Sequence, residues 1–188
     1  KCRYWEKNGR AMRLRKYLAI CSLCLFGIIA ARADTVTLTV VQNEKAPVIA
    51  MDMSNAIEDE IFGCYYDAGH ITSNTEIRLD GSRFKDTKFG IKEAAFGLSD
   101  FLVVIDLQYG PAEITDNEHK ITYAELDTLT WRLVEVKSSK IIVEKKIDVK
   151  NIKVTDFDPY KRSRFVAQTT ASDSLSAIAK FKEGRDDK

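Results

Sequence analysis

The feature that most constrains this fold is a run of apolar residues in the middle of the chain, at residues 101–107 (FLVVIDL). Such a run, without polar alternation, is typical of a strand that is covered on both faces or lies at the centre of its sheet. The whole chain has 188 residues, 45% of them hydrophobic and 30% charged, with only 3 prolines and 9 glycines. This composition excludes a disordered or collagen-like chain and fits one globular domain.

Alternating β-branched and apolar residues predict further strands on both sides of this run. The expected ranges are 35–42, 71–79, 121–136, 140–149 and 164–169. Residues 137–139 separate two of these strands closely enough to predict a hairpin. A change of apolar face within 121–136 predicts a bulge, and the polar stretch 111–120 is expected to be a loop.

Three helices are expected from apolar residues at steps of three and four, at about 54–68, 87–98 and 172–182. In the first, Asn55 and Glu58 resemble a capping box, and Gly69 is the expected stop. Residues 156–160 are expected to be a loop, and the charged tail from residue 183 is expected to fray.

The order of elements favours an α/β fold, a single two-layer α/β sandwich with a mixed sheet. It begins with β-α-β-α-β, continues with a late β-hairpin and ends with a C-terminal helix. Early helices and a late meander argue against a doubly wound nucleotide-binding fold. Consistently, the sequence contains neither GxGxxG nor GxxxxGK, so we expect no cofactor.

The amino-terminal part has the three features of a secretory signal peptide. A basic segment after Met12 is followed by the uncharged run 17–31, and Ala31 and Ala33 fit the cleavage rule, with Asp34 as the first mature residue. We therefore divide the chain into a probable upstream extension at 1–11, the signal peptide at 12–33 and one domain at 34–188.

Two alternatives to cleavage concern how the protein would be anchored. The 15 residues of the apolar run are short of the roughly 20 that a membrane-spanning helix needs. Cys21 lies near the front of the apolar run instead of after it, which disfavours a lipoprotein signal. We therefore predict a periplasmic protein that contacts the membrane only through the signal peptide, if that stays uncleaved.

Charge and cysteine content limit the partners of the domain. Residues 34–188 contain 21 basic and 27 acidic side chains, and this acidic balance disfavours nucleic acid. Cys64 is the one cysteine after the signal peptide, so the domain has no internal disulfide. Its place among apolar helix residues favours a buried core position.

Two stretches resemble a superfamily of bacterial envelope domains. Residues 98–107 are similar to its segment in which small-small-Asp-aromatic precedes an apolar strand, and residues 130–143 resemble its signature hairpin. The superfamily comprises the amino-terminal domain of TolB, the periplasmic domain of the curli secretion pore and the lipoprotein activators of penicillin-binding proteins. Glu135 stands where the hairpin usually has Asp, and Ser139 where its turn usually has Gly. The resemblance implies a fold that binds partner proteins and carries no catalytic residues.

No catalytic or metal-binding motif stands out from the residues themselves. His70 and His119 are 49 residues apart, and a site formed by His119 with Asp116 and Glu118 is disfavoured because such loop residues are usually solvated. A glycan hydrolase would need paired carboxylates. The available acids are Asp52, Glu58, Asp59, Glu60, Asp67, Asp156 and Asp158. Most of the first five are expected on the solvent side of one helix, so we predict neither a catalytic nor a metal site.

For partner binding, the candidate contacts are Tyr66, Tyr109 and Tyr160, which have polar neighbours and are expected to be exposed. Trp131 and Tyr65 are expected in the core. An unpaired strand at the sheet edge is a second way to bind a partner, including a second copy of the chain. The sequence thus predicts a non-catalytic protein-binding domain of the cell envelope. The alternative is a small periplasmic hydrolase that acts on cell-wall glycan or peptide through dispersed carboxylates.

Overall fold

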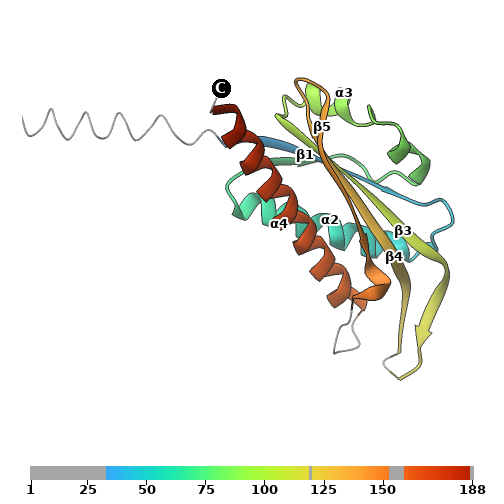
Figure 1. Ribbon diagram of the computed structural model, residues 1–188. Coiled ribbons are helices and arrows are strands. Elements are labelled where there is room, and N and C mark those ends of the chain that lie inside the picture. Colours follow the sequence, from blue (N-terminus) through green and yellow to red (C-terminus); the bar gives the residue numbers. More distant parts are fainter. Residues whose placement is uncertain (1–32, 119, 153–158, 187–188) are drawn as a thin grey trace, which may run out of the picture. The chain divides into compact units, whose positions relative to one another are not determined.

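The computed structural model describes residues 33–118, 120–152 and 159–186. Within them, five strands form one mixed sheet in the order β2-β1-β3-β4-β5 (Figure 1). The strands are β1 (Thr35–Gln42), β2 (Ile71–Asn74), β3 (Phe101–Asp116), β4 (Ile121–Glu135) and β5 (Lys140–Asp148). The chain has the α/β fold that the sequence predicts.

β3 is the central strand of the sheet. It pairs in parallel with β1 and antiparallel with β4, and all residues from 101 to 107 are buried. β2 extends the parallel half beyond β1, and β5 completes the predicted hairpin with β4. The apolar run therefore has the central position predicted for it.

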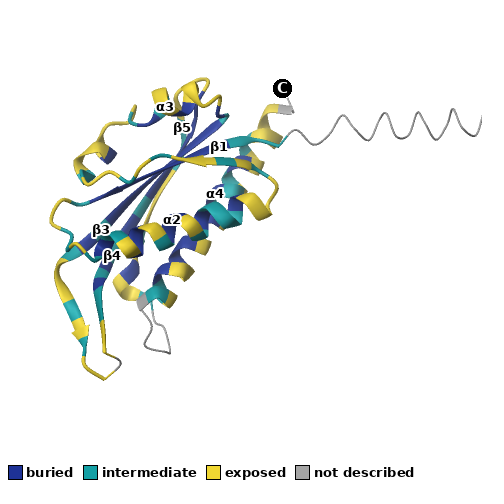
Figure 2. Cartoon of the chain, turned by 180° about the vertical axis from the view of Figure 1, so that it is seen from behind, coloured by how far each residue is buried: buried dark blue, intermediate teal, exposed yellow. Residues whose placement is uncertain are grey.

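Two long helices, α2 (Ala50–Asp67) and α4 (Pro159–Asp186), cover one face of the sheet (Figures 1 and 2). Successive side chains of a strand point to opposite faces, so Val36, Leu38 and the other alternate residues meet these helices. Trp131 of β4 is fully buried in this main core, as expected.

Shorter segments cover part of the opposite face, namely η1 (Gly81–Lys85) and α3 (Ile91–Phe96). They enclose a second, smaller apolar cluster of Val41, Phe84, Ala94, Leu102, Val104, Val134 and Val136. This arrangement explains why the central strand is apolar on both faces.

Arg132 of β4 fastens this second layer to the sheet. Its buried guanidinium donates to Glu144 of β5 at 2.7 Å and to the backbone carbonyl of Phe84 at 2.9 Å. It also lies 4.5 Å from the centre of the Phe84 ring, within the range of a cation–π contact. Because Arg132 binds both β5 and η1, η1 is held over the sheet by hydrogen bonds as well as by apolar packing.

The first helix begins four residues earlier than predicted. Ala50 donates to the carbonyl of Pro47, and Ile49 caps the helix without a side-chain hydrogen bond. The expected capping box of Asn55 and Glu58 is therefore wrong, because both residues lie inside α2. The predicted stop is confirmed, since Gly69 directly follows the helix end with a φ of 84°.

Several other predicted bounds differ from the structure. β2 ends at Asn74, and α3 is short because Gly90, with a φ of 79°, precedes it and Gly97 ends it. The stretch expected as a loop instead continues β3 to Asp116, with register shifts between residues 108 and 113. A register shift at 133/134 confirms the bulge expected in β4. A short 3₁₀ turn, η2 (Val149–Asn151), follows β5.

The predicted strand at 164–169 is wrong, because these residues lie in α4. This helix also continues through Asp186, so most of the tail that was expected to fray is helical. The buried positions of α4 recur at helical spacing: Ser163, Val166, Ala167, Thr170, Ala171, Ser174 and Ile178. The hydroxyl of Tyr65 in α2 donates to Ser174 at 2.7 Å and joins the two helices.

Residues 34–188 form one compact unit. The predictions on the upstream extension, on the signal peptide with Ala31, on His119 and on the carboxylates Asp156 and Asp158 lie outside the described residues.

Candidate functional site

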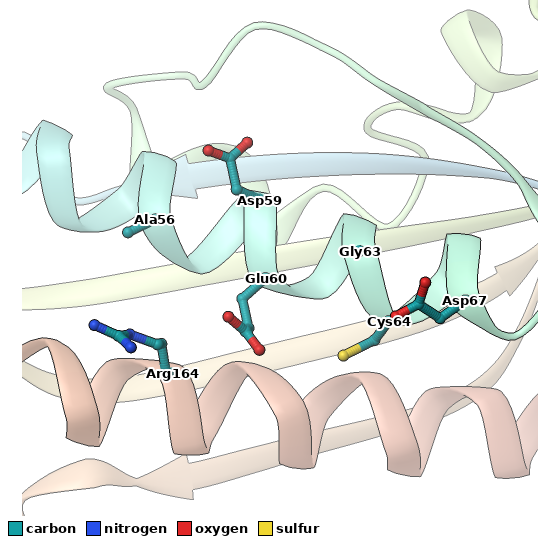
Figure 3. A pocket seen from close by; sticks show the side chains of 7 residues that line it. All are labelled: Ala56, Asp59, Glu60, Gly63, Cys64, Asp67 and Arg164. Carbon is teal, nitrogen blue, oxygen red and sulfur yellow. The ribbon is translucent and has the colours of Figure 1, made fainter.

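An acidic groove of about 470 Å³ runs between α2 and α4 (Figure 3). Asp59, Glu60 and Asp67 line it from α2, and Arg164 lines it from α4. The side chains of Glu60 and Cys64 point toward α4, and Glu60 accepts a hydrogen bond of 2.7 Å from Gln168. The groove therefore gathers carboxylates on an open surface between two helices.

Cys64 in this groove is half-buried, and not a fully buried core residue as the sequence suggested. Burial raises the pKa of its thiol, and the nearby charges of Glu60 and Asp67 raise it further. Since the thiolate is the reactive form, these surroundings hold the sulfur in its less nucleophilic state at neutral pH. The groove geometry thus gives Cys64 no activation.

Glu58 is the acid of α2 that departs most from expectation. Its side chain is buried, at 6% exposure, and does not face solvent. Its Oε1 atom is buried and has no hydrogen-bond partner among the described residues. Loss of hydration raises the pKa of Glu58, a hydrogen bond with the Asn74 side chain lowers it, and the charge of Asp59 adds to the rise. A buried carboxylate oxygen without a donor is costly, and such a group calls for an explanation.

Glu58 lines a second groove of about 340 Å³, which we call the edge groove. Met51, Asn55 and Glu58 of α2 form one wall, and residues 74–77, which begin with the last residue of β2, form the other. These residues cover the side of α2 that carries Glu58, which is the physical reason for its burial. Sequence spacing alone gave no sign of this packing.

The edge groove lies beside an open edge of the sheet. Among the described strands, β2 is the outermost and pairs with β1 alone. The amides of Ile71 and Thr75 donate to the carbonyls of Asp34 and Leu38. By alternation along the strand, the intervening amides of residues 72 and 74 point away from β1. These outward groups are able to pair with an additional strand.

The two edges of the sheet differ in how far they discourage such pairing. β5, at the opposite edge, carries Lys140, Glu144, Lys145, Lys146 and Asp148. Charged side chains of this kind are a common protection against edge-to-edge association. β2 has the sequence ITSN without a charge, and its Ile71 side chain is exposed. The β2 edge is therefore the better candidate for contact with another protein.

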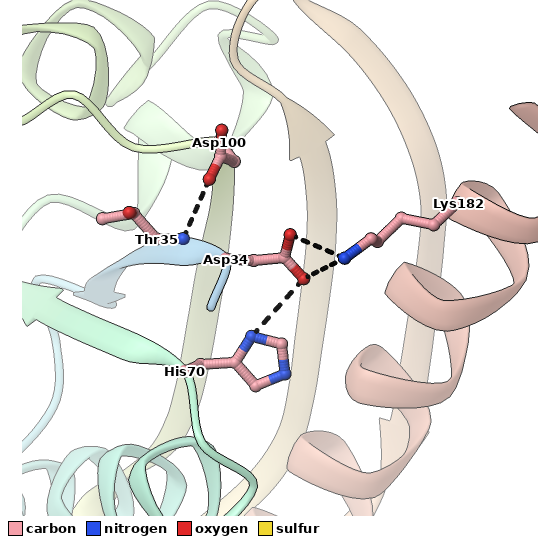
Figure 4. A network of polar contacts seen from close by, with 5 residues as sticks. All are labelled: Asp34, Thr35, His70, Asp100 and Lys182. Atoms are coloured by element: carbon pink, nitrogen blue, oxygen red, sulfur yellow. Dashed lines mark hydrogen bonds and ion pairs between the residues drawn. The ribbon is translucent and has the colours of Figure 1, made fainter. Parts of the chain in front are cut away.

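Asp34 holds the start of β1 in place beside this edge (Figure 4). Lys182 of α4 donates to both of its carboxylate oxygens, at 2.9 and 3.0 Å, and Nδ1 of His70 lies 3.7 Å from Oδ2. The next amide, that of Thr35, donates to Asp100 at 3.0 Å. The predicted first mature residue is thus an integral part of the fold.

The three tyrosines predicted as partner contacts do not share one environment. Tyr66, at the end of α2, is 70% exposed, as expected, and Tyr160 is half-buried. Tyr109 is only 3% exposed, so its expected exposure is wrong. Its hydroxyl lies 2.9 Å from Ser54 of α2, because the register of β3 points this side chain into the main core. Of the three, Tyr66 remains available on the surface.

The described residues include no cluster of three or more His, Cys, Asp or Glu side chains arranged as metal ligands. His70 contacts Asp34 and packs edge-on against the ring of Tyr65. Among the helices within the described ranges, none is long and apolar enough to span a bilayer.

Comparison with known proteins assigns the chain to one family. A family model described as "Uncharacterised protein" matches residues 35–179, which is most of the compact unit. No curated protein matches the sequence.

Several solved bacterial structures match the chain. A PelC dodecamer from Paraburkholderia phytofirmans has 12% identity and a TM-score of 0.42, and the match covers 75% of this chain and 88% of that one. A lipoprotein from Neisseria meningitidis has 12% identity and a TM-score of 0.40, with 78% and 99% covered. TolB from Acinetobacter baumannii has 9% identity and a TM-score of 0.39, with 79% of this chain and 29% of TolB covered. These identities are far below those from which a shared activity follows, so function is argued from the residues of this chain.

Proposed function

The chain belongs to the family of uncharacterised proteins whose model matches residues 35–179, and we propose that it is an exported, non-catalytic domain that binds another protein of the bacterial cell envelope. Export is supported by the signal-peptide pattern that ends at Ala33. Protein binding is supported by the hairpin at residues 130–143, whose resemblance is to domains that act through partner proteins.

The observation that carries the proposal is the buried Glu58 beside the open β2 edge, whose Oε1 atom has no hydrogen-bond partner among the described residues. A partner segment that lies along β2 would hydrogen bond to its outward backbone groups, as in other cases of strand addition. A donor side chain of the same segment, such as Lys, Arg or Asn, would enter the edge groove and supply the missing bond to Glu58. Main-chain pairing would then provide affinity, and the Glu58 contact would provide specificity.

The experiment that tests this proposal is site-specific photocrosslinking in cells. A photoreactive residue replaces Ile71 on the β2 edge, and a matched control replaces Phe165, an exposed apolar residue on α4. We expect a discrete adduct with one envelope protein from position 71 and none from position 165.

A second variant ties the adduct to the edge groove. Glu58→Gln keeps the size of the side chain but removes its charge, so it should weaken the contact with the partner's donor and reduce the adduct formed from position 71 while the protein stays folded. Equal adducts from both positions, or an adduct that Glu58→Gln does not reduce, would contradict binding at the edge groove.

A further inference from the structure

A second surface feature lies at a different place from the edge groove. Phe96, the last residue of α3, and Leu98 flank Gly97 where α3 leads through a turn into β3, and the two residues are 92% and 85% exposed. Leu98 also has a φ of 57°, in the left-handed region where Gly or Asn is favoured. The chain therefore carries an apolar side chain where neither hydration nor backbone geometry favours one.

This turn lies at the end of the sheet where the chain enters the domain. Close to it, the amide of Asp100 donates to the carbonyl of Thr35 at 2.8 Å, and the amide of Val136 donates to the carbonyl of Asp100 at 3.0 Å. The turn is thus next to the start of β1 and to the β4–β5 turn. The sequence that leads into Asp34 contains the uncharged apolar run at 17–31.

The segment that leads into the turn carries more basic than acidic residues, although the domain as a whole is acidic. Residues 83–98 contain four basic and two acidic side chains, all of them exposed, and Arg83 at the start of this segment forms an ion pair with Asp80. Lys137 and Lys140 of the neighbouring β4–β5 turn are also exposed. A local excess of positive charge favours contact with a negatively charged surface, even on a domain that is acidic as a whole.

We propose that the Phe96-Gly97-Leu98 turn inserts into the interfacial region of an anionic phospholipid bilayer, with the surrounding lysines on its headgroups. Two protruding apolar side chains at the end of a lysine-rich segment suit shallow insertion, in which apolar burial and attraction to anionic lipid act together. A standard protein interface would need about 800 Å² on each partner, which is more than a short turn supplies. This contact goes beyond the proposed protein binding, and it differs from the sequence-based expectation that only the signal peptide meets the membrane.

The test is co-sedimentation of residues 34–188 with lipid vesicles, since every described strand, helix and core residue belongs to this compact unit. One set of vesicles contains phosphatidylethanolamine and phosphatidylglycerol, and the other contains only neutral phosphatidylcholine. The variant combines Phe96→Ser with Leu98→Asn, because Asn adopts positive φ readily. The matched control is Val48→Ser, which removes a 91% exposed apolar side chain at the opposite end of β1.

We expect binding to the anionic vesicles that falls at least about tenfold in the double variant, as loss of two buried apolar side chains implies. Val48→Ser should bind like the wild type, and thermal unfolding should show that both variants are folded. Absence of wild-type binding to anionic vesicles, or equal binding by the double variant, would overturn the proposal. If the double variant binds vesicles normally but loses a protein adduct, the turn is a protein contact and the lipid assignment is wrong.

Discussion

Replacement of Glu58 by Gln should stabilise the domain at neutral pH. The pKa of Glu58 is raised above its ordinary value of 4.5, mainly because burial disfavours the charged form. Each unit of such a rise costs about 1.4 kcal/mol of folding free energy once pH exceeds both the unfolded and the folded pKa. With one oxygen lacking a donor, we expect Glu58→Gln to add about 1 kcal/mol to the free energy of unfolding at pH 7. For a domain of this size that corresponds to a rise in Tm of about 2–4 °C.

The pH dependence of this gain has a definite sign. In the native state the raised pKa means that Glu58 binds its proton more tightly than in the unfolded state. Protonated Glu58 therefore makes its full contribution to the free energy of unfolding below pH 4.5. That contribution is lost as pH rises through the native pKa. The advantage of Glu58→Gln should accordingly be present at pH 7 and vanish near pH 4.

Urea denaturation of wild type and variant between pH 4 and pH 8 measures this difference. Glu113→Gln, the same chemical change at an exposed position of β3, serves as the control and should leave stability nearly unchanged. A gain that does not depend on pH, or a loss of stability at pH 7, would show that Glu58 is well solvated or paired in the native state. In that case the central observation behind the edge-groove proposal would be incorrect.

Two further substitutions test how the fold is held together, both measured by chemical denaturation. Arg132→Ala should lower the free energy of unfolding by about 2–3 kcal/mol, because it removes the donor for Glu144 and for a buried carbonyl. The control is Arg78→Ala, at an exposed ion pair, which should lower it by less than about 0.5 kcal/mol. An equal cost for the two arginines would refute the fastening role of Arg132. Ser139→Gly should raise the free energy of unfolding by up to about 1 kcal/mol, since Ser139 has a φ of 57° where the resembled hairpin has Gly. A clear loss of stability would mean that the serine side chain makes a compensating contact.

The parts of the fold that were predictable are those where burial follows sequence directly. The run at 101–107 is apolar because both faces of β3 are covered, so its central place could be inferred without the structure. The hairpin at 137–139 and the stop at Gly69 depend on short-range turn geometry, which residue types encode locally.

Other elements were missed because their sequence lacks the expected contrast between apolar and polar faces. α4 packs on α2 through small residues, including Ala167, Thr170, Ala171 and Ser174, and this stripe does not stand out as hydrophobic. β-branched residues at 166, 169 and 170 instead give this segment the sequence pattern of a strand. The outer part of β3, up to Asp116, extends beyond the main core, where a strand tolerates polar residues. The sequence of this part is therefore as polar as that of a loop.

The candidate site was the least predictable part, because it depends on contacts between distant segments. Nothing in the spacing of Asp52, Glu58, Asp59 and Glu60 shows that residues 74–77 cover Glu58 and leave its neighbours exposed or half-buried. The same holds for Tyr109, whose side chain points inward through the register of β3 with β4. Exposure and partner assignment at such positions require the tertiary structure.

Two of the features that lower stability are linked to the proposals, and they lie on different surfaces. Oε1 of Glu58 lacks a hydrogen-bond donor among the described residues beside the β2 edge, and Leu98 combines exposure with a left-handed backbone at the end of the sheet. Neither residue is needed to form the sheet, whose own residues agree in burial and strand propensity. Local conflicts of this kind in an otherwise consistent fold are where function is expected. On the proposals above, the basic turn would hold the domain against a membrane while the β2 edge remains free to bind a partner, so one small domain would bring an envelope protein to the membrane surface.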